Sequence, residues 1–317
     1  MPPMKKLALG LCLIFGIFFF SGCYRHSLAR GDPQPLPSFD PPAAPPKIAL
    51  VLGGGGSKGL AHVGVIRELE DAGIHPDLIV GCSSGALIGA LYADDPNANH
   101  LEDLLLDLKR KDLMDFSFFY SRFGLVKGKS LENFLKENLG AHFFDALKIP
   151  LVVVATDLHT GELLELGGGP LLPALCGSAA VPGVFKPVPY LGRHLVDGGA
   201  VDPVPVRIAK KYGAQVIIAV DVGEMLSDQE IVHFFGIVKR GLEISYRQLA
   251  KEAAREADVL LQMNFQGLGM FSDKHNEEIY EVGRCKAREL LPHIEQVISE
   301  KLLEHPDDHA PRWLLVK

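Results

Sequence analysis

The feature that most constrains this fold is a short serine motif between an apolar run and a helical segment. Gly81-Cys82-Ser83-Ser84-Gly85 directly follows the apolar run Leu78–Val80 and precedes a helix-like sequence. A G-x-S-x-G motif between a strand and a helix is typical of a nucleophile elbow, in which the serine lies at the tip of a sharp turn. Gly81 and Gly85 would let strand and helix approach closely because they carry no Cβ atom. The motif therefore predicts a nucleophilic serine at residue 83.

A second glycine-rich turn lies upstream of the serine motif. Residues 53–59, with the sequence GGGGSKG, follow the strand-like run at residues 48–52 and open a helix expected over residues 60–72. Bare backbone N–H groups at a helix N-terminus favour an anion, either a phosphate or the oxyanion of an acyl-transfer intermediate. The turn also satisfies G-x-G-x-x-G, but a dinucleotide site usually has an acidic residue at the end of the next strand. That strand ends in the serine motif, which favours oxyanion binding.

The residues alone leave the catalytic base open. Three aspartates follow strand-like runs and could each reach the serine: Asp157, Asp197 and Asp221. Three histidines in nearby segments could also act as a base, although only their positions suggest it: His62, His159 and His194. Of the aspartates, Asp197 precedes Gly198-Gly199, a pair that allows another backbone to approach closely.

Alternation of apolar runs and helical patterns predicts the architecture. The clearest strands are expected at residues 48–52, 78–80, 151–155, 216–220 and 259–263, and the clearest later helices at residues 101–111, 130–139, 231–257 and 277–303. This alternation is typical of a mainly parallel central sheet with helices on both faces, an α/β fold. The roughly 270 residues that follow the first 46 are within reach of one large domain.

Taken together, the motifs resemble those of the patatin-like phospholipase family. The resemblance rests on Gly54–Gly59, Gly81–Gly85 and Asp197-Gly198-Gly199, and residues 177–187 are similar to a further family segment. It extends over roughly residues 47–221. It implies a three-layer α/β/α fold and a Ser–Asp dyad, with Ser83 as the nucleophile and Asp197 as the base.

The resemblance also implies roles for the neighbouring residues and for the substrate. The oxyanion donors would be the N–H groups of Gly54, Gly55 and Gly56. The residues that support the motifs would be Lys58, Gly59, Gly81, Gly85, Gly198 and Gly199. Ser83 would attack the carbonyl of a phospholipid or lysophospholipid to give an acyl-enzyme that water hydrolyses, with no cofactor and no metal. Two alternatives remain, a phosphate- or nucleotide-binding protein and a catalytically idle lipid-binding member.

The N-terminus suggests where the protein is located. Lys5-Lys6 precede the apolar run Leu7–Phe20, which has the length of a signal-peptide core and is short for a membrane-spanning helix. Phe20-Ser21-Gly22-Cys23 resembles the bacterial lipobox, in which the cysteine is lipidated, although Phe20 replaces the usual leucine. An uncut signal anchor is the alternative. Tyr24 in place of aspartate favours the outer membrane in a cell envelope with two membranes.

These features divide the chain into three parts. We expect a lipoprotein signal peptide at residues 1–22, a lipidated Cys23 with a Pro-rich tether at residues 23–46, and an acyl hydrolase domain at residues 47–317. A Pro-rich tether favours extended conformations and acts as a semi-rigid spacer.

Charge, cysteines and one aromatic segment add further expectations. Loss of Lys5 and Lys6 with a signal peptide would leave 30 basic residues, from 32, against 39 acidic ones, a net charge of about −9 that argues against a nucleic-acid partner. Three cysteines remain after the lipobox, without metal-type spacing, and we expect them to be structural: Cys82, Cys176 and Cys285. The aromatic residues within 114–123 could form a lid or acyl-chain wall, but packing under the helices is favoured. The sequence leaves the oligomeric state open.

Overall fold

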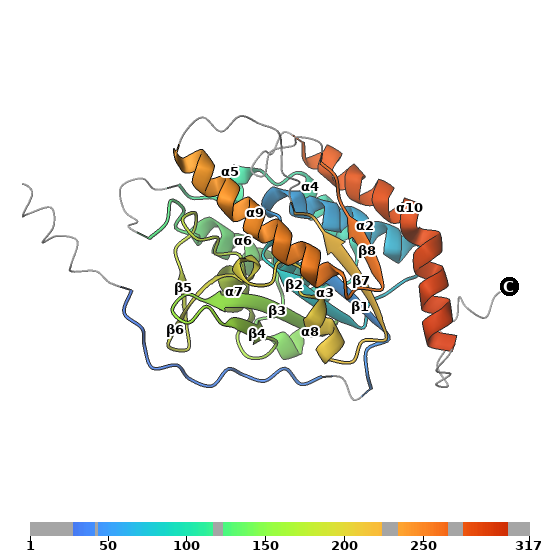
Figure 1. Ribbon diagram of the computed structural model, residues 1–317, viewed down its shortest axis with the longest axis horizontal. Helices are drawn as coiled ribbons and strands as arrows, with labels where there is room; N and C mark the ends of the chain where they lie inside the picture. Colours follow the sequence, from blue (N-terminus) through green and yellow to red (C-terminus); the bar gives the residue numbers. More distant parts are fainter. Residues whose placement is uncertain (1–27, 42–43, 117–122, 224–233, 266–274, 304–317) are drawn as a thin grey trace, which may run out of the picture.

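A mostly parallel sheet forms the centre of the molecule (Figure 1). The computed structural model describes residues 28–41, 44–116, 123–223, 234–265 and 275–303. Along the sheet the strand order is β5-β6-β3-β2-β1-β7-β8, with β4 paired to β3. The parallel strands are β1 (Ile48–Leu52), β2 (Leu78–Cys82), β3 (Leu151–Asp157), β7 (Val216–Asp221) and β8 (Val259–Gln262). The antiparallel strands at one edge are β4 (Leu163–Leu166), β5 (Val188–Tyr190) and β6 (Arg193–Asp197).

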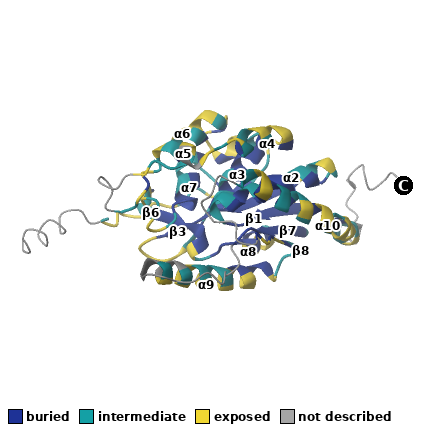
Figure 2. Cartoon of the chain, turned by 90° about the horizontal axis from the view of Figure 1, so that it is seen from above, coloured by how far each residue is buried: buried dark blue, intermediate teal, exposed yellow. Residues whose placement is uncertain are grey.

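Helices cover both faces of this sheet, as the sequence predicts. One face carries α2 (Leu60–Asp71), α3 (Ser84–Asp94), α4 (Ala98–Leu106), α7 (Leu171–Ser178) and α10 (Asn276–Leu303). The other carries α8 (Val206–Lys211) and α9 (Phe234–Ala254), and Figure 2 shows α9 on the side of the sheet opposite α4. Alternate side chains of β1 serve the two layers: Leu50 and Leu52 pack in the larger core, whereas Ala49 and Val51 pack beneath α8. Because the parallel strands in the middle of the sheet are buried on both faces, their sequences are continuously apolar.

The helix expected at residues 101–111 is the clearest departure from the predicted elements. It begins earlier, because the Asn97 side chain accepts a hydrogen bond of 3.1 Å from the His100 N–H and so caps α4. It ends at Leu106, and a separate short helix, α5 (Arg110–Leu113), precedes α6 (Lys129–Asn138). The antiparallel strands β4 and β5 were not expected, because they are short and only partly apolar.

The Pro-rich segment lies against the domain. The N–H of Gln34 donates to the Leu191 carbonyl at 3.0 Å, and Arg193 donates to the Gln34 carbonyl at 2.5 Å. Further along, the Phe39 ring meets the Tyr212 ring edge-on, with 4.7 Å between centroids. The described residues of this segment therefore form a strap along the molecule, seen at the lower edge of Figure 1, rather than a spacer that extends away from it. Within the part of the chain that the structure describes, no helix is long and apolar enough to cross a membrane.

Candidate active site

Ser83 occupies the sharp turn that its motif predicts. β2 ends at Cys82 and α3 begins at Ser84, and Ser83 between them has φ 53° and ψ −122°. A non-glycine residue in this region carries strain of about 1–3 kcal/mol, which the surrounding structure must offset. The turn closes so tightly that a Cβ on Gly85 would lie 2.1 Å from the Leu52 carbonyl oxygen, and one on Gly81 would lie 2.5 Å from the Ala86 Cα. The two glycines therefore make the elbow possible.

A buried serine outside the motif helps to hold the elbow. The N–H of Ser83 donates to Oγ of Ser178 at 2.9 Å, and Ser178 is fully buried at the end of α7. The sequence marks residues 177–187 only by their similarity to a family segment and does not single out Ser178. The signal that could have found it is a small hydroxyl residue next to a glycine at a helix end, where close packing is possible.

The structure brings Asp197 to Ser83. Asp197 ends β6, its Oδ1 accepts a 2.7 Å hydrogen bond from the Gly199 N–H, and its backbone carbonyl accepts one of 3.0 Å from Thr156. Both Asp197 and Ser83 are only 6% exposed. Burial raises the pKa of Asp197 to about 6, although hydrogen bonds from Ser83, Gly199 and Cys82 act in the opposite direction. A carboxylate with this pKa is ionised at neutral pH and is a better base than an exposed aspartate.

The other two candidate aspartates have structural partners away from the serine. Oδ1 of Asp157 accepts from the His159 N–H at 2.8 Å, and its Oδ2 lies 3.8 Å from Nε of Arg193. Asp221 binds Arg247 at 2.8 Å and the Gly223 N–H at 2.9 Å. Both carboxylates therefore have a structural role that does not involve Ser83.

The candidate histidines are also engaged elsewhere. Nε2 of His62 lies 2.8 Å from the Gly53 carbonyl oxygen, and burial lowers the pKa of His62 to about 4, so its ring is neutral at pH 7. His159 and His194 pair with each other at the surface, with 3.1 Å between ring nitrogens. The geometry therefore supports Asp197, rather than any of these three histidines, as the partner of Ser83.

The glycine loop differs from the expected oxyanion hole in two of its three donors. The N–H of Gly54 donates to the Pro203 carbonyl at 3.0 Å, and that of Gly55 donates to Oγ of Ser84 at 3.1 Å. Two other N–H groups, those of Gly56 and Ser84, have no acceptor among the described residues, and both residues line the adjacent cavity. The residue after an elbow nucleophile commonly supplies such a donor. The geometry therefore leaves Gly56 as a candidate oxyanion donor and adds the N–H of Ser84 as a second candidate.

The residues that flank the motifs permit close packing. A Cβ on Gly59 would lie 2.7 Å from Cβ of Ser84, and one on Gly198 would lie 2.5 Å from the Val154 carbonyl oxygen. The Lys58 side chain is 1% exposed, with Nζ 5.1 Å from the centre of the Phe265 ring. The glycine loop thus packs directly on the elbow, and the Asp197 turn packs on β3.

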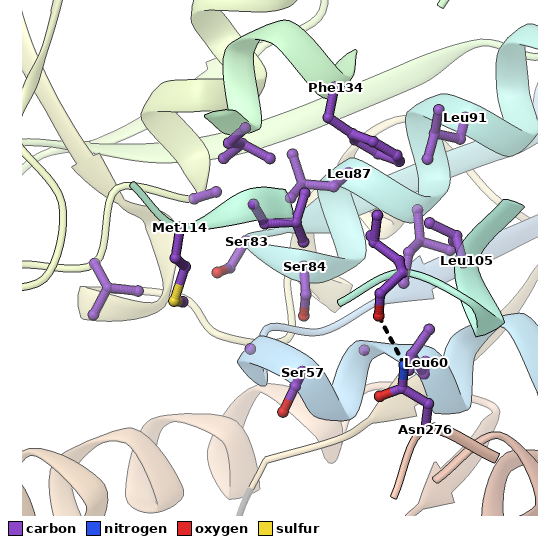
Figure 3. A pocket seen from close by; sticks show the side chains of 18 of the residues that line it. Ser57, Leu60, Ser83, Ser84, Leu87, Leu91, Leu105, Met114, Phe134 and Asn276 are labelled. Atoms are coloured by element: carbon purple, nitrogen blue, oxygen red, sulfur yellow. Dashed lines mark hydrogen bonds between the residues drawn. The ribbon is translucent and has the colours of Figure 1, made fainter. Parts of the chain in front are cut away.

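An apolar cavity of about 170 Å³ opens beside Ser83. Figure 3 shows Leu87 and Leu91 of α3 gathered with Phe134 of α6 on one side of it. Its other lining is also largely aliphatic, with few polar side chains beyond the two serines of the elbow. Such a cavity suits a hydrocarbon chain better than a phosphate or a nucleotide.

Among the described residues of the aromatic segment, those before residue 117 and Phe123, only Met114 lines this cavity. Met114 lines the cavity, whereas Phe116 is 44% exposed and so does not pack as core. Phe118, Phe119 and Tyr120 lie outside the described residues.

Cys82, the neighbour of Ser83, is unsuited to nucleophilic chemistry. Burial and the nearby Asp197 carboxylate raise the pKa of the Cys82 thiol well above its usual value, so the thiol stays protonated. Cys176 and Cys285 are also free thiols. Within the described ranges, no group of histidine, cysteine and acidic side chains is arranged to hold a metal ion.

Comparison with known proteins gives the same family as the motifs. The profile named patatin-like phospholipase matches residues 50–210, which include both Ser83 and Asp197. An uncharacterised NTE family protein of Mycobacterium tuberculosis is 35% identical over 179 residues, covering 56% of this chain and 49% of that protein. Human patatin-like phospholipase domain-containing protein 6 is 32% identical over 184 residues, covering 56% of this chain and 13% of that protein. The matched region thus spans less than half of both relatives.

Among solved structures, VipD from Legionella pneumophila superposes with a TM-score of 0.54 and covers 88% of this chain and 72% of that one. Its sequence identity of 14% means that the likeness concerns the fold alone. It agrees with the three-layer α/β/α arrangement described above. Because the family profile spans half of the sequence and contains the elbow, the glycine loop and the Asp197 turn, the chain belongs to the patatin-like phospholipase family.

Proposed function

We propose that this protein is a serine acyl-ester hydrolase that acts on phospholipids or lysophospholipids through a Ser83–Asp197 dyad. The observation that carries the proposal is that Ser83, which lines an apolar cavity, contacts the buried carboxylate of Asp197. Ser83 lies in the cavity wall, and Asp197 contacts Ser83 from the buried side. An acyl chain in the cavity would bring its ester carbonyl to the Ser83 hydroxyl.

The reaction follows from these positions. Asp197 accepts the Ser83 hydroxyl proton as Oγ attacks the ester carbonyl carbon, and the N–H groups of Gly56 and Ser84 bind the oxyanion that forms. The tetrahedral intermediate expels the alcohol, which takes the proton from Asp197, and leaves an acyl-enzyme on Ser83. Water then attacks the acyl carbon and gives a proton to Asp197. The second tetrahedral intermediate breaks its bond to Oγ of Ser83, which takes that proton back from Asp197, and a fatty acid is released.

The two alternative functions are less well supported. In a phosphate-binding loop several consecutive N–H groups would have to face the ligand, whereas those of Gly54 and Gly55 already have acceptors. An idle lipid-binding protein would not need a buried carboxylate against the strained serine.

Labelling and lipid release together test the proposed activity. We expect a fluorophosphonate probe to label the full chain, and vesicles of phosphatidylcholine or lysophosphatidylcholine to release fatty acid with it. Ser83→Ala should lose both, while Ser245→Ala, at an exposed position on α9, should retain both. If the wild-type protein is unlabelled but binds the vesicles, the lipid-binding alternative is correct.

We further propose that the chain is anchored in a bacterial cell envelope through lipidated Cys23, with an outer membrane favoured where two membranes exist. The lipobox-like sequence Phe20–Cys23 supports this proposal, and so does the strap. The strap brings the chain to the turn between β5 and β6, and five residue-to-residue steps lead from Cys23 to Leu28. At about 3.5 Å per residue they span less than about 20 Å, so the domain would be held close to the lipid surface.

Fractionation tests the anchor independently of the chemistry. Cys23→Ser should move the protein from the membrane fraction to uncut precursor or soluble forms, and ester hydrolysis by the soluble form should persist. Mature-size protein that stays in the membrane fraction would indicate a different attachment.

A further inference from the structure

Tyr246, which no motif marks, contacts two parts of the candidate active site, the glycine loop and the Asp197 turn. It lies near the middle of α9, on the face of the sheet opposite the cavity-lining helices. Its phenol reaches between the glycine loop and the Asp197 turn. Burial raises the pKa of Tyr246 well above its usual value, and the nearby Cys82, Asp197 and Asp221 raise it further. The hydroxyl therefore stays protonated and acts as a hydrogen-bond donor.

The ring occupies a slot between three glycines. A Cβ on Gly54 would lie 2.8 Å from the Tyr246 hydroxyl oxygen, one on Gly199 would lie 2.7 Å from Cε2, and one on Gly223 would lie 3.1 Å from Cε1. Any side chain at Gly54 or Gly199 would displace the ring. The absence of side chains at these positions therefore serves to admit Tyr246 as well as to shape the turns.

The hydroxyl fixes one peptide of the glycine loop. Tyr246 donates to the Gly54 carbonyl oxygen, while the N–H on the other side of that peptide, on Gly55, donates to Ser84. A peptide unit is planar, so hydrogen bonds at both ends fix its orientation. The next N–H along the chain is that of Gly56, the proposed oxyanion donor, and its direction depends on the peptide before it.

The ring fixes the surroundings of the carboxylate. It packs on Gly199, whose N–H donates to Oδ1 of Asp197 at 2.7 Å. Because burial is the main reason that the pKa of Asp197 is raised, a ring that excludes water at this point contributes to that pKa. The other titratable groups near the carboxylate are Cys82 from β2 and Asp202 after β6, and Asp221 with Arg247 lies on the far side of Tyr246.

We propose that Tyr246 is a positioning residue that aligns the Gly56 oxyanion donor through its hydroxyl and keeps water from Asp197 through its ring. The proposal rests on the function proposed above and adds a residue of α9 to it. Two variants separate the two contributions: Tyr246→Phe removes only the hydroxyl, whereas Tyr246→Leu removes both the hydroxyl and the ring. Tyr212→Phe is the matched control, since the Tyr212 hydroxyl donates to Glu165 at 3.0 Å at a different site.

Kinetics on a soluble nitrophenyl ester test both contributions. Tyr246→Phe should lower kcat by about tenfold or more with KM within twofold, because a misaligned donor weakens binding of the transition state rather than of the substrate. The acid limb of its pH profile, the fall of kcat/KM at low pH, should occur at the same pH as in the wild-type protein. Tyr246→Leu should lose at least as much kcat, and its acid limb should move to lower pH as water reaches Asp197. Tyr212→Phe should behave as the wild-type protein.

Hydrogen exchange supplies a readout that does not require activity. Amides of the peptide that contains residues 53–59 should exchange faster in Tyr246→Phe than in the wild-type protein or in Tyr212→Phe, at equal melting temperature. Unchanged kcat together with unchanged exchange in this peptide would overturn the proposal. A wild-type protein without esterase activity would contradict the proposed function, and the exchange comparison would still decide whether Tyr246 holds the loop.

Discussion

The two sides of Ser83 differ in the chemistry of their side chains and in the elements that supply them. On one side lie a carboxylate, a thiol and a phenol, packed between glycines: Asp197, Cys82 and Tyr246. On the other side the cavity is lined by aliphatic and aromatic side chains of α3 to α6, among them Leu87 and Phe134. Under the proposed function, the polar side contains the groups that set the rate of the reaction, and the apolar side contains those that select the acyl chain. A substitution on one side should therefore leave the property of the other unchanged.

The largest expected effect comes from the base on the polar side. Asp197→Asn keeps the shape of the side chain but removes the proton acceptor, so kcat should fall about a hundredfold or more while the preference among acyl chains stays the same. Turnover of a series of nitrophenyl esters measures both quantities. A normal kcat in this variant would show that Asp197 is not the base of the reaction.

The same substitution should make the protein more stable. The pKa of Asp197 is raised from 3.8 to about 6, so the stability it contributes is present below the unfolded pKa and is lost as the pH rises through about 6. Above that pH the ionised carboxylate destabilises the fold by on the order of 3 kcal/mol. Asp197→Asn should therefore raise Tm by several °C at about pH 8 and much less at about pH 4. Equal Tm differences at both pH values would contradict the raised pKa.

The second effect is the pH dependence of the reaction. Because Asp197 must be ionised to accept a proton, kcat/KM should fall about tenfold per pH unit below a pKa of about 6. His159→Ala and His194→Ala should keep this limb, since the two rings pair with each other at the surface. A limb that disappears in either histidine variant would show that a histidine, not Asp197, is the base.

The third effect belongs to the apolar side. Leu87→Trp adds volume to the cavity wall, so long-chain esters should lose about tenfold in kcat/KM relative to short-chain ones, with the acid limb unchanged. Leu249→Trp, at a position on α9 that is 37% exposed, is the matched control and should have no effect. Equal losses for long and short esters would mean that this cavity does not hold the acyl chain.

The smallest effect is expected where the two sides meet. Ser84→Ala removes the acceptor of the Gly55 N–H, a hydrogen bond worth about 1 kcal/mol, so kcat should fall about fivefold. Ser84→Thr keeps the hydroxyl and should recover most of the activity. A wild-type rate in Ser84→Ala would show that the glycine loop does not need this contact.

The sequence by itself determined those strands whose apolar pattern matches their burial in the sheet, and also the elbow. The strands at residues 48–52, 78–82 and 216–221 lie close to their predicted bounds, because strands buried on both faces must be continuously apolar. The elbow could be predicted as well, since only glycines at positions 81 and 85 permit so tight a turn around Ser83. The choice of Asp197 over the other aspartates required the family resemblance, because all three end strand-like runs.

Only the tertiary structure decided which groups meet. The N–H groups of Gly54 and Gly55 are bonded elsewhere because Pro203 and Ser84, distant in sequence, provide their acceptors. The strap lies on the domain because the Leu191 turn and the Tyr212 ring offer it partners that its proline content does not reveal. The role of Tyr246 also depends on tertiary structure, because its position in α9 matches no motif. Its contacts exist because the sheet brings three separate glycine turns together around its ring. Local sequence specifies the turn that a segment can make, whereas the acceptor or ring that it meets depends on long-range packing.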